Sequence, residues 1–228
     1  MLQNKDQFLL ISLPQACIYI FICLQIIAML VYPGGTYFDL ESSQYSLTRN
    51  FLSDLGRYKS FSGENNFISC QLFNMSLIMA GGVFIIFYYK VATLFALYNK
   101  LARLGSILGG LGGFSLIAVG LTPSDLYFSL HVISAKFIFR FFLLTAIIFS
   151  WLIFKSKIIN FQYAVGYIIF TILLLIYLII SEFGPSPKSN ELALTFQVIS
   201  QKLILIVMIL SVYWQTTGIK INFFNQSQ

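Results

Sequence analysis

Four residues of this sequence have the types needed for hydrolytic chemistry. Ser53 and Asp54 lie in the stretch RNFLSDLGR, Asp125 lies between two long apolar stretches, and His131 is the only histidine. A serine, a histidine and an aspartate can serve as nucleophile, general base and orienting group. No nucleophile-elbow motif surrounds Ser53, and a lone histidine at the end of an apolar stretch is also typical of a packed or interfacial group. A membrane-embedded, lipid-modifying enzyme is therefore an alternative hypothesis.

Three cations, Lys136, Arg140 and Lys202, interrupt apolar stretches. A charge inside a membrane helix costs roughly 2.5–3.5 kcal/mol on insertion scales. At about 1.5 Å per residue, Lys136 and Lys202 lie about 12–15 Å from the outer ends of their predicted helices, with Arg140 one turn deeper. The pattern predicts an outward-facing polar, cationic cavity, with these candidate ligand-binding residues: Asn74, Lys136, Arg140, Gln197, Gln201, Lys202 and Asp54. A hydrogen-bonded network that only holds helices together is the other interpretation.

Residues 50–56 are predicted to form a short interfacial helix above this polar layer. Asn50 is a good N-cap residue, and Gly56 suits the position just past a helix end. Buried cations need a compensating anion, and no carboxylate lies inside a predicted span. We therefore expect the Asp54 carboxylate within salt-bridge distance of one of the three cations, or in a pocket that they share.

Composition places these residues in a membrane protein. The chain is 58% hydrophobic and 10% charged, whereas soluble domains carry about 25% charged residues. The net charge of +6 is spread over short connections, so it does not predict a nucleic-acid partner. The cysteines, all in apolar stretches, indicate small core residues rather than a metal or disulfide set. With one histidine and no carboxylate in a predicted span, the sequence predicts no metal site and no cofactor.

Six stretches are long enough to cross a membrane, which needs about 20 apolar residues. They are Phe8–Tyr32, Phe67–Tyr89, Leu101–Leu121, Tyr127–Phe154, Phe161–Ser181 and Leu192–Trp214. The sequence thus predicts an all-α polytopic membrane protein, residues 1–228 forming a single six-helix domain. Lysine and arginine bias puts both termini in the cytoplasm and the loop 33–66 outside. Glycines at four-residue spacing, Gly105, Gly109 and Gly113, predict close packing of the third helix, and Gly81 of the second helix belongs to the predicted partner surface.

The stretches NFLSDLG, FISCQLFNMSLIMAGG and GGLGGFSLIAVGLTPSDLYFSLH, within Asn50–Phe142, resemble the family called domain of unknown function 998. The resemblance implies a six-helix prokaryotic membrane protein, with no activity to carry over. Its pattern falls on Ser53, Asp54, Leu55, Gly56, Asn74, Gly81, Gly120, Pro123, Asp125 and His131. Lys136, Arg140 and Lys202 do not belong to that pattern.

These observations predict an integral membrane protein that binds an anionic lipid or amphiphile in its polar cavity. The expected location is the prokaryotic inner (cytoplasmic) membrane, and the expected partner is membrane lipid. A lipid-modifying enzyme and a structural or scaffold subunit are the alternatives. A membrane-protein partner or a second copy of the chain is left open.

Overall fold

The structure, a computed structural model, describes residues 4–224, and every regular element in that range is helical. The elements are α1 (Asn4–Gln7), η1 (Phe8–Ser12), α2 (Leu13–Leu30), η2 (Leu52–Gly56), α3 (Phe67–Thr93), η3 (Ala96–Tyr98), α4 (Asn99–Leu121), α5 (Phe128–Ser156), α6 (Phe161–Phe183) and α7 (Glu191–Phe223). Within residues 4–224, six helical segments are long and apolar enough to cross a membrane, the first running continuously from Asn4 to Leu30. The predicted all-α, six-span fold is confirmed.

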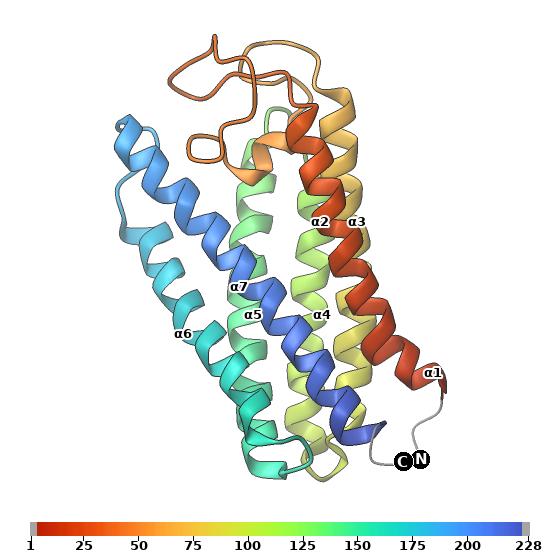
Figure 1. The fold of residues 1–228 in the computed structure, drawn as a ribbon. Helices are drawn as coiled ribbons and strands as arrows, with labels where there is room; N and C mark the ends of the chain where they lie inside the picture. The colour runs from red at the N-terminus through yellow and green to blue at the C-terminus, as the bar shows by residue number, and fades with distance from the viewer. Residues whose placement is uncertain (1–3, 225–228) are drawn as a thin grey trace.

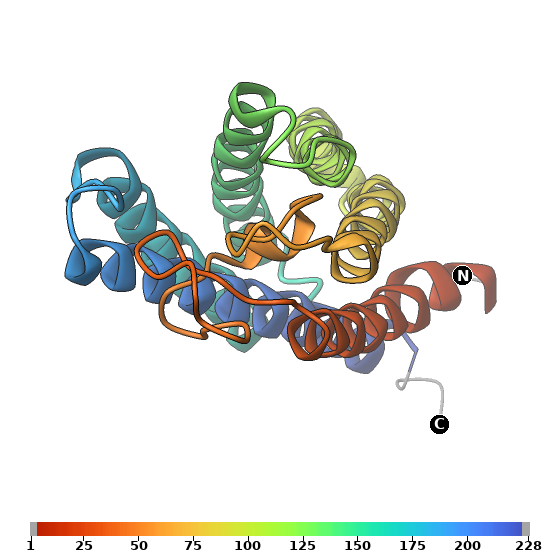
Figure 2. The same cartoon turned by 90° about the horizontal axis from the view of Figure 1, so that it is seen from above.

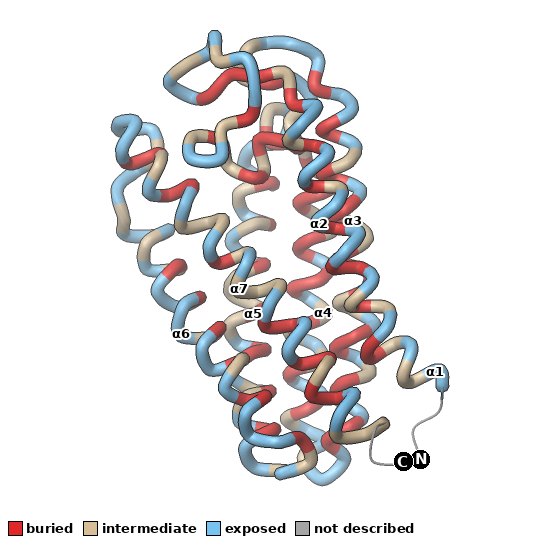
Figure 3. The backbone as a smooth tube through the Cα atoms, viewed as in Figure 1, coloured by how far each residue is buried: buried red, intermediate tan, exposed pale blue. Residues whose placement is uncertain are grey.

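Helices that follow one another in the chain pack against one another, and α7 returns to contact α2. Figure 1 shows α2 to α5 running nearly side by side, with α7 crossing them at a slant and α6 at the edge. Burial follows this arrangement, because 56% of the apolar window of α3 is buried but only 22% of that of α6. Figure 3 shows the buried positions gathered on the facing sides of the inner helices. Helix α6 therefore leaves most of its apolar surface on the outside of the bundle.

Glycine allows α3 and α4 to approach most closely. A Cβ atom on Gly81 would collide with the main-chain oxygen of Gly113, and one on Gly113 would collide with that of Gly81. Gly109 packs directly on the ring of Tyr88. The close packing predicted from the glycine spacing is confirmed at these positions. Gly110, which belongs to the same stretch, faces open space instead.

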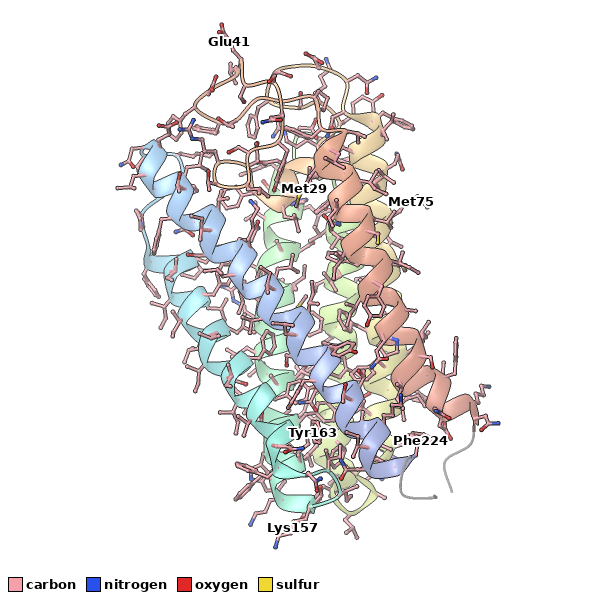
Figure 4. The ribbon with its side chains drawn as sticks, in the orientation of Figure 1. Met29, Glu41, Met75, Lys157, Tyr163 and Phe224 are labelled. Carbon is pink, nitrogen blue, oxygen red and sulfur yellow. The ribbon has the colours of Figure 1, made fainter. Side chains whose placement is uncertain are left out.

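The connection between α2 and α3 covers one end of the bundle, which we call the loop end. Glu41 projects from its apex, and Lys157 lies at the opposite end of the molecule (Figure 4). Helix α1 and the last turns of α7 also lie at that opposite end. The two ends of the described chain thus share one side. That this side is cytoplasmic remains a prediction from the charge bias.

Candidate functional site

The short 3-10 helix η2 forms a cap over the helices at the loop end. Seen from above, it lies at the centre of the ring formed by the long helices (Figure 2). Its N-cap residue is Phe51, one position later than the predicted Asn50. The Asp54 carboxylate accepts a hydrogen bond from the Phe51 backbone N–H at 2.8 Å and from Asn50 Nδ2 at 3.4 Å. Asp54 therefore points back into its own turn and holds it closed.

Burial changes the acidity of Asp54. The side chain is 7% exposed, and desolvation raises the pKa of its carboxyl from 3.8 to about 6. Arg57, the hydrogen bonds from Asn50 and Phe51, and Lys202 each act in the opposite direction and lower this pKa. The desolvation cost exceeds their combined effect because no cation forms a direct ion pair with Asp54 in residues 4–224.

Two neighbouring side chains of α7 attach the cap to the bundle. Gln201 Oε1 accepts a hydrogen bond from the Leu52 backbone N–H at 3.0 Å. Lys202 Nζ donates to the Asn50 carbonyl oxygen at 2.5 Å and lies 5.2 Å from the centre of the Tyr45 ring. The hydroxyl of Tyr45 donates to the same Asn50 carbonyl at 3.2 Å. Lys202 is thus satisfied by a backbone carbonyl and an aromatic face.

The N-terminal part of α3 and its N-cap residue, Asn66, form hydrogen bonds with the cap. Asn74 Nδ2 donates to the Gly56 carbonyl oxygen at 3.4 Å and to Cys70 Sγ at 3.2 Å. Asn66 Nδ2 donates to the carbonyl oxygens of Leu55 and Arg57 at 3.0 and 2.8 Å. Position 56 has no room for a side chain, since a Cβ atom there would collide with the Phe73 ring and Asn74 Oδ1. The stretch singled out by the resemblance is therefore a capping unit fastened to α3.

The cations of α5 form a separate group, which we call the α5–α6 ion cluster. Lys136 Nζ lies 3.1 Å from Glu182 Oε2, and Arg140 Nη2 lies 2.6 Å from Glu182 Oε1. Arg140 Nη1 also donates to the Lys136 carbonyl at 3.0 Å. The expectation that Asp54 compensates Lys136 or Arg140 is wrong, because Glu182 does so. Helix α6 continues to Phe183, so a carboxylate lies in a span that was predicted to end at Ser181.

The four candidate catalytic residues are engaged in separate structural contacts. Asp125 accepts hydrogen bonds from the backbone N–H groups of Tyr58 and Lys59, each at 2.9 Å. His131 is buried at 5% exposure, and its Nδ1 lies 2.6 Å from the Thr122 carbonyl oxygen. Asp54 holds the cap turn, as described above, and Ser53 is half-buried. Among residues 4–224, no hydrogen bond joins Ser53, His131 and an aspartate in the arrangement that a triad needs.

Gln197 of α7 forms hydrogen bonds with the end of α6 and with the connection that follows it. Its Nε2 donates to the carbonyl oxygens of Ile180 and Pro185 at 3.0 and 3.1 Å. Of the seven predicted ligand-binding residues, the structure therefore gathers Asp54, Asn74, Gln201 and Lys202 around the cap. Lys136 and Arg140 lie apart from them with Glu182, and Gln197 fastens the end of α6.

An apolar cavity of about 40 Å³ lies among four helices further from the loop end. Its lining is Pro14, Cys17, Ile18 and Phe21 of α2, Leu77, Ala80, Val83 and Phe84 of α3, Leu116 of α4, and Leu205, Met208 and Ile209 of α7. This lining differs from the predicted cationic one, because Lys136 and Arg140 contact Glu182 and Lys202 contacts the Asn50 carbonyl.

The fold and these sites define a class, the six-helix integral membrane proteins with a capped polar layer. A family model described as Protein of unknown function (DUF998) matches residues 26–212, and the chain belongs to this family. The match extends beyond the stretch Asn50–Phe142 on which the resemblance rests. No curated protein and no solved structure matches the chain.

Proposed function

We propose that the protein binds the head group of an anionic membrane lipid at the α5–α6 ion cluster. The observation that supports this most strongly is a charge imbalance on an accessible surface. Lys136 and Arg140 place two cationic side chains, 44% and 40% exposed, against the single carboxylate of Glu182. The cluster therefore carries a net positive charge with donors left free to bind an anion.

The depth of the cluster makes a bound anion favourable. At about 1.5 Å per residue, Lys136 lies about 12 Å and Arg140 about 18 Å along α5 from its start. Exposed charges at such depths require snorkelling, local thinning or water defects, and each charge costs roughly 2.5–3.5 kcal/mol on insertion scales. A lipid phosphate drawn towards the cluster offers charge-assisted hydrogen bonds to the guanidinium and the ammonium. An anionic lipid offsets this cost better than a zwitterionic one.

Lipid has direct access to this surface. Helix α6 is the least buried of the spans, and it packs between α5 and α7 at the edge of the bundle. A head group at the cluster would place its acyl chains along the exposed apolar residues of α6, such as Ile172, Ile176 and Ile179. With both termini in the cytoplasm, as the charge bias predicts, the lipid would belong to the outer leaflet.

The test varies the charge of the cluster in both directions. Lipid retention is measured by native mass spectrometry after reconstitution with phosphatidylglycerol and phosphatidylcholine. Replacing both Lys136 and Arg140 with Met should weaken phosphatidylglycerol retention about thirtyfold, whereas Glu182→Gln should strengthen it about fivefold, as ion-pair energies near 1 kcal/mol per charge imply. Lys155→Met, at the opposite end of α5, is the matched control and should leave retention unchanged.

The sign of the Glu182→Gln effect separates lipid binding from a purely structural role. If the cluster only holds α5 to α6, Glu182→Gln removes its carboxylate and should lower stability with no gain in phosphatidylglycerol retention. That result, or equal retention of both lipids by the wild type, would refute the proposal.

A further inference from the structure

A groove lies at the end of the molecule opposite the loop end, between the start of the described chain and α3. Its volume is about 710 Å³. The lining residues are Lys5, Asp6, Leu9, Ile85, Ile86, Tyr89 and Lys90. Of these, Lys5, Ile86 and Tyr89 are exposed. The groove is therefore open to the surroundings of the bundle.

An irregular turn of the first helical segment forms one wall of this groove. The Leu13 backbone N–H donates to the Phe8 carbonyl, five residues earlier, and this is the hydrogen bond of a π-helix. Pro14 follows and has no N–H to offer to the Leu10 carbonyl. Such turns kink helices and are frequent at functional sites. Figure 1 and Figure 2 both show α1 extending outward past the edge of the bundle.

The charges that line the groove do not balance. Lys90 Nζ lies 2.8 Å from Asp6 Oδ1, and the two side chains are 26% and 21% exposed. Lys5 forms no ion pair with a carboxylate among residues 4–224. An ammonium group has three donors, and Asp6 Oδ1 takes one of those of Lys90. Two ammonium groups thus share one carboxylate, and the groove keeps a net positive charge.

An apolar strip on the outer face of α3 continues from the groove towards the middle of the span. Ile86 and Gly82 precede Lys90 by four and eight residues, so the three share one face of the helix. A Cβ atom on Gly82 would meet no heavy atom within 4 Å, which leaves a shallow place on this face. Tyr89, 67% exposed, is typical of the membrane interface. The surface thus combines a charged margin with an apolar strip.

We propose that this groove binds an anionic phospholipid of the leaflet on this side of the membrane. Its phosphate accepts charge-assisted hydrogen bonds from Lys5 and Lys90, and an acyl chain lies over Ile86 and Gly82. The surplus positive charge favours an anionic head group over a zwitterionic one, and the apolar strip favours a lipid over a soluble phosphate. With both termini in the cytoplasm, as the charge bias predicts, this is the inner leaflet. The site shares no residue with the α5–α6 ion cluster and does not depend on it.

The test measures how fast each lysine is acetylated by acetic anhydride, a neutral reagent, with peptide mass spectrometry as the readout. The protein is held in detergent micelles that contain increasing amounts of phosphatidylglycerol or phosphatidylcholine with the same acyl chains. Half-maximal protection of Lys5 and Lys90 should need about fivefold less phosphatidylglycerol, the factor that corresponds to an ion pair of about 1 kcal/mol. Lys100 and Lys155, exposed lysines at the same end, are internal controls and should show no such preference.

Variants assign the preference to the charges of the groove. Asp6→Asn removes the carboxylate of the lining and should strengthen the protection of Lys5 by phosphatidylglycerol, whereas Lys90→Met should weaken it. Lys100→Met is the matched control and should leave it unchanged. If the Lys90–Asp6 pair only holds α1 to α3, Asp6→Asn should lower stability without strengthening protection, and that result would overturn the proposal.

The wild-type protein alone also decides the matter. Equal protection by the two lipids, equal protection by glycerol 1-phosphate at the same concentration, or equal protection of Lys100 and Lys155 would each contradict a lipid site in the groove. Because this comparison needs no variant, misfolding of Asp6→Asn or Lys90→Met leaves it decisive. The readout is local to Lys5 and Lys90, so it is independent of lipid binding at the α5–α6 ion cluster.

Discussion

Replacing single glycines of α3 and α4 with alanine should lower the stability of the protein at some positions and raise it at others. The direction depends on which atoms the added methyl group contacts. A Cβ atom on Gly81 or Gly113 would collide with a main-chain oxygen of the other helix, and that oxygen cannot move unless the helices separate. Over-packing of this kind costs about 1–3 kcal/mol. Gly82 and Gly110 lie in the same two helices but have no heavy atom within 4 Å of an added Cβ. Alanine there gains about 0.8–1 kcal/mol of helix propensity.

The assay is thermal unfolding in detergent micelles, with 1 kcal/mol corresponding to about 2–4 °C for a chain of this size. Gly81→Ala and Gly113→Ala should lower the Tm by several degrees, and Gly82→Ala and Gly110→Ala should leave it unchanged or raise it slightly. Equal shifts for all four variants would show that α3 and α4 do not pack through a glycine contact. A Gly81→Ala variant as stable as Gly82→Ala would likewise contradict close contact between the two backbones at Gly81.

Two further predictions concern the loop end. Burial raises the folded-state pKa of Asp54 from 3.8 to about 6. The folded protein therefore keeps this proton up to a higher pH than the unfolded chain does. The resulting contribution to stability, about 3 kcal/mol, is complete below about pH 4 and is lost as the pH rises through 6. Unfolding measured between pH 4 and 7.5 should show this loss in the wild type and in Asp39→Asn but not in Asp54→Asn; an unchanged pH profile in Asp54→Asn would argue against a buried, titrating carboxyl. In a Cys23→Ser background, a cysteine replacing Glu64 should react with an impermeant thiol reagent from outside, and one replacing Asn160 should not. The reverse pattern would place the termini outside.

The sequence alone determined the class of the protein and the number of its candidate membrane-spanning helices. Long apolar stretches have few stable alternatives to helices in lipid, so six spans follow from hydropathy and length. The four-residue glycine spacing likewise predicts a close helix contact, since removing side chains lets backbones approach whatever the partner is. The short motifs around Ser53, Asn74 and Asp125 were sufficient to suggest the family.

Tertiary structure decided which polar groups meet. The position of Glu182 shows why, because α6 extends two residues past its predicted end and thereby brings a carboxylate to Lys136 and Arg140. Helix ends and relative helix rotations depend on packing between segments far apart in the chain, which local composition does not encode. For the same reason Asp54, expected to neutralise a cation, instead closes its own turn, and Lys202 meets a carbonyl of the cap. The apolar cavity arises only where α2, α3, α4 and α7 come together.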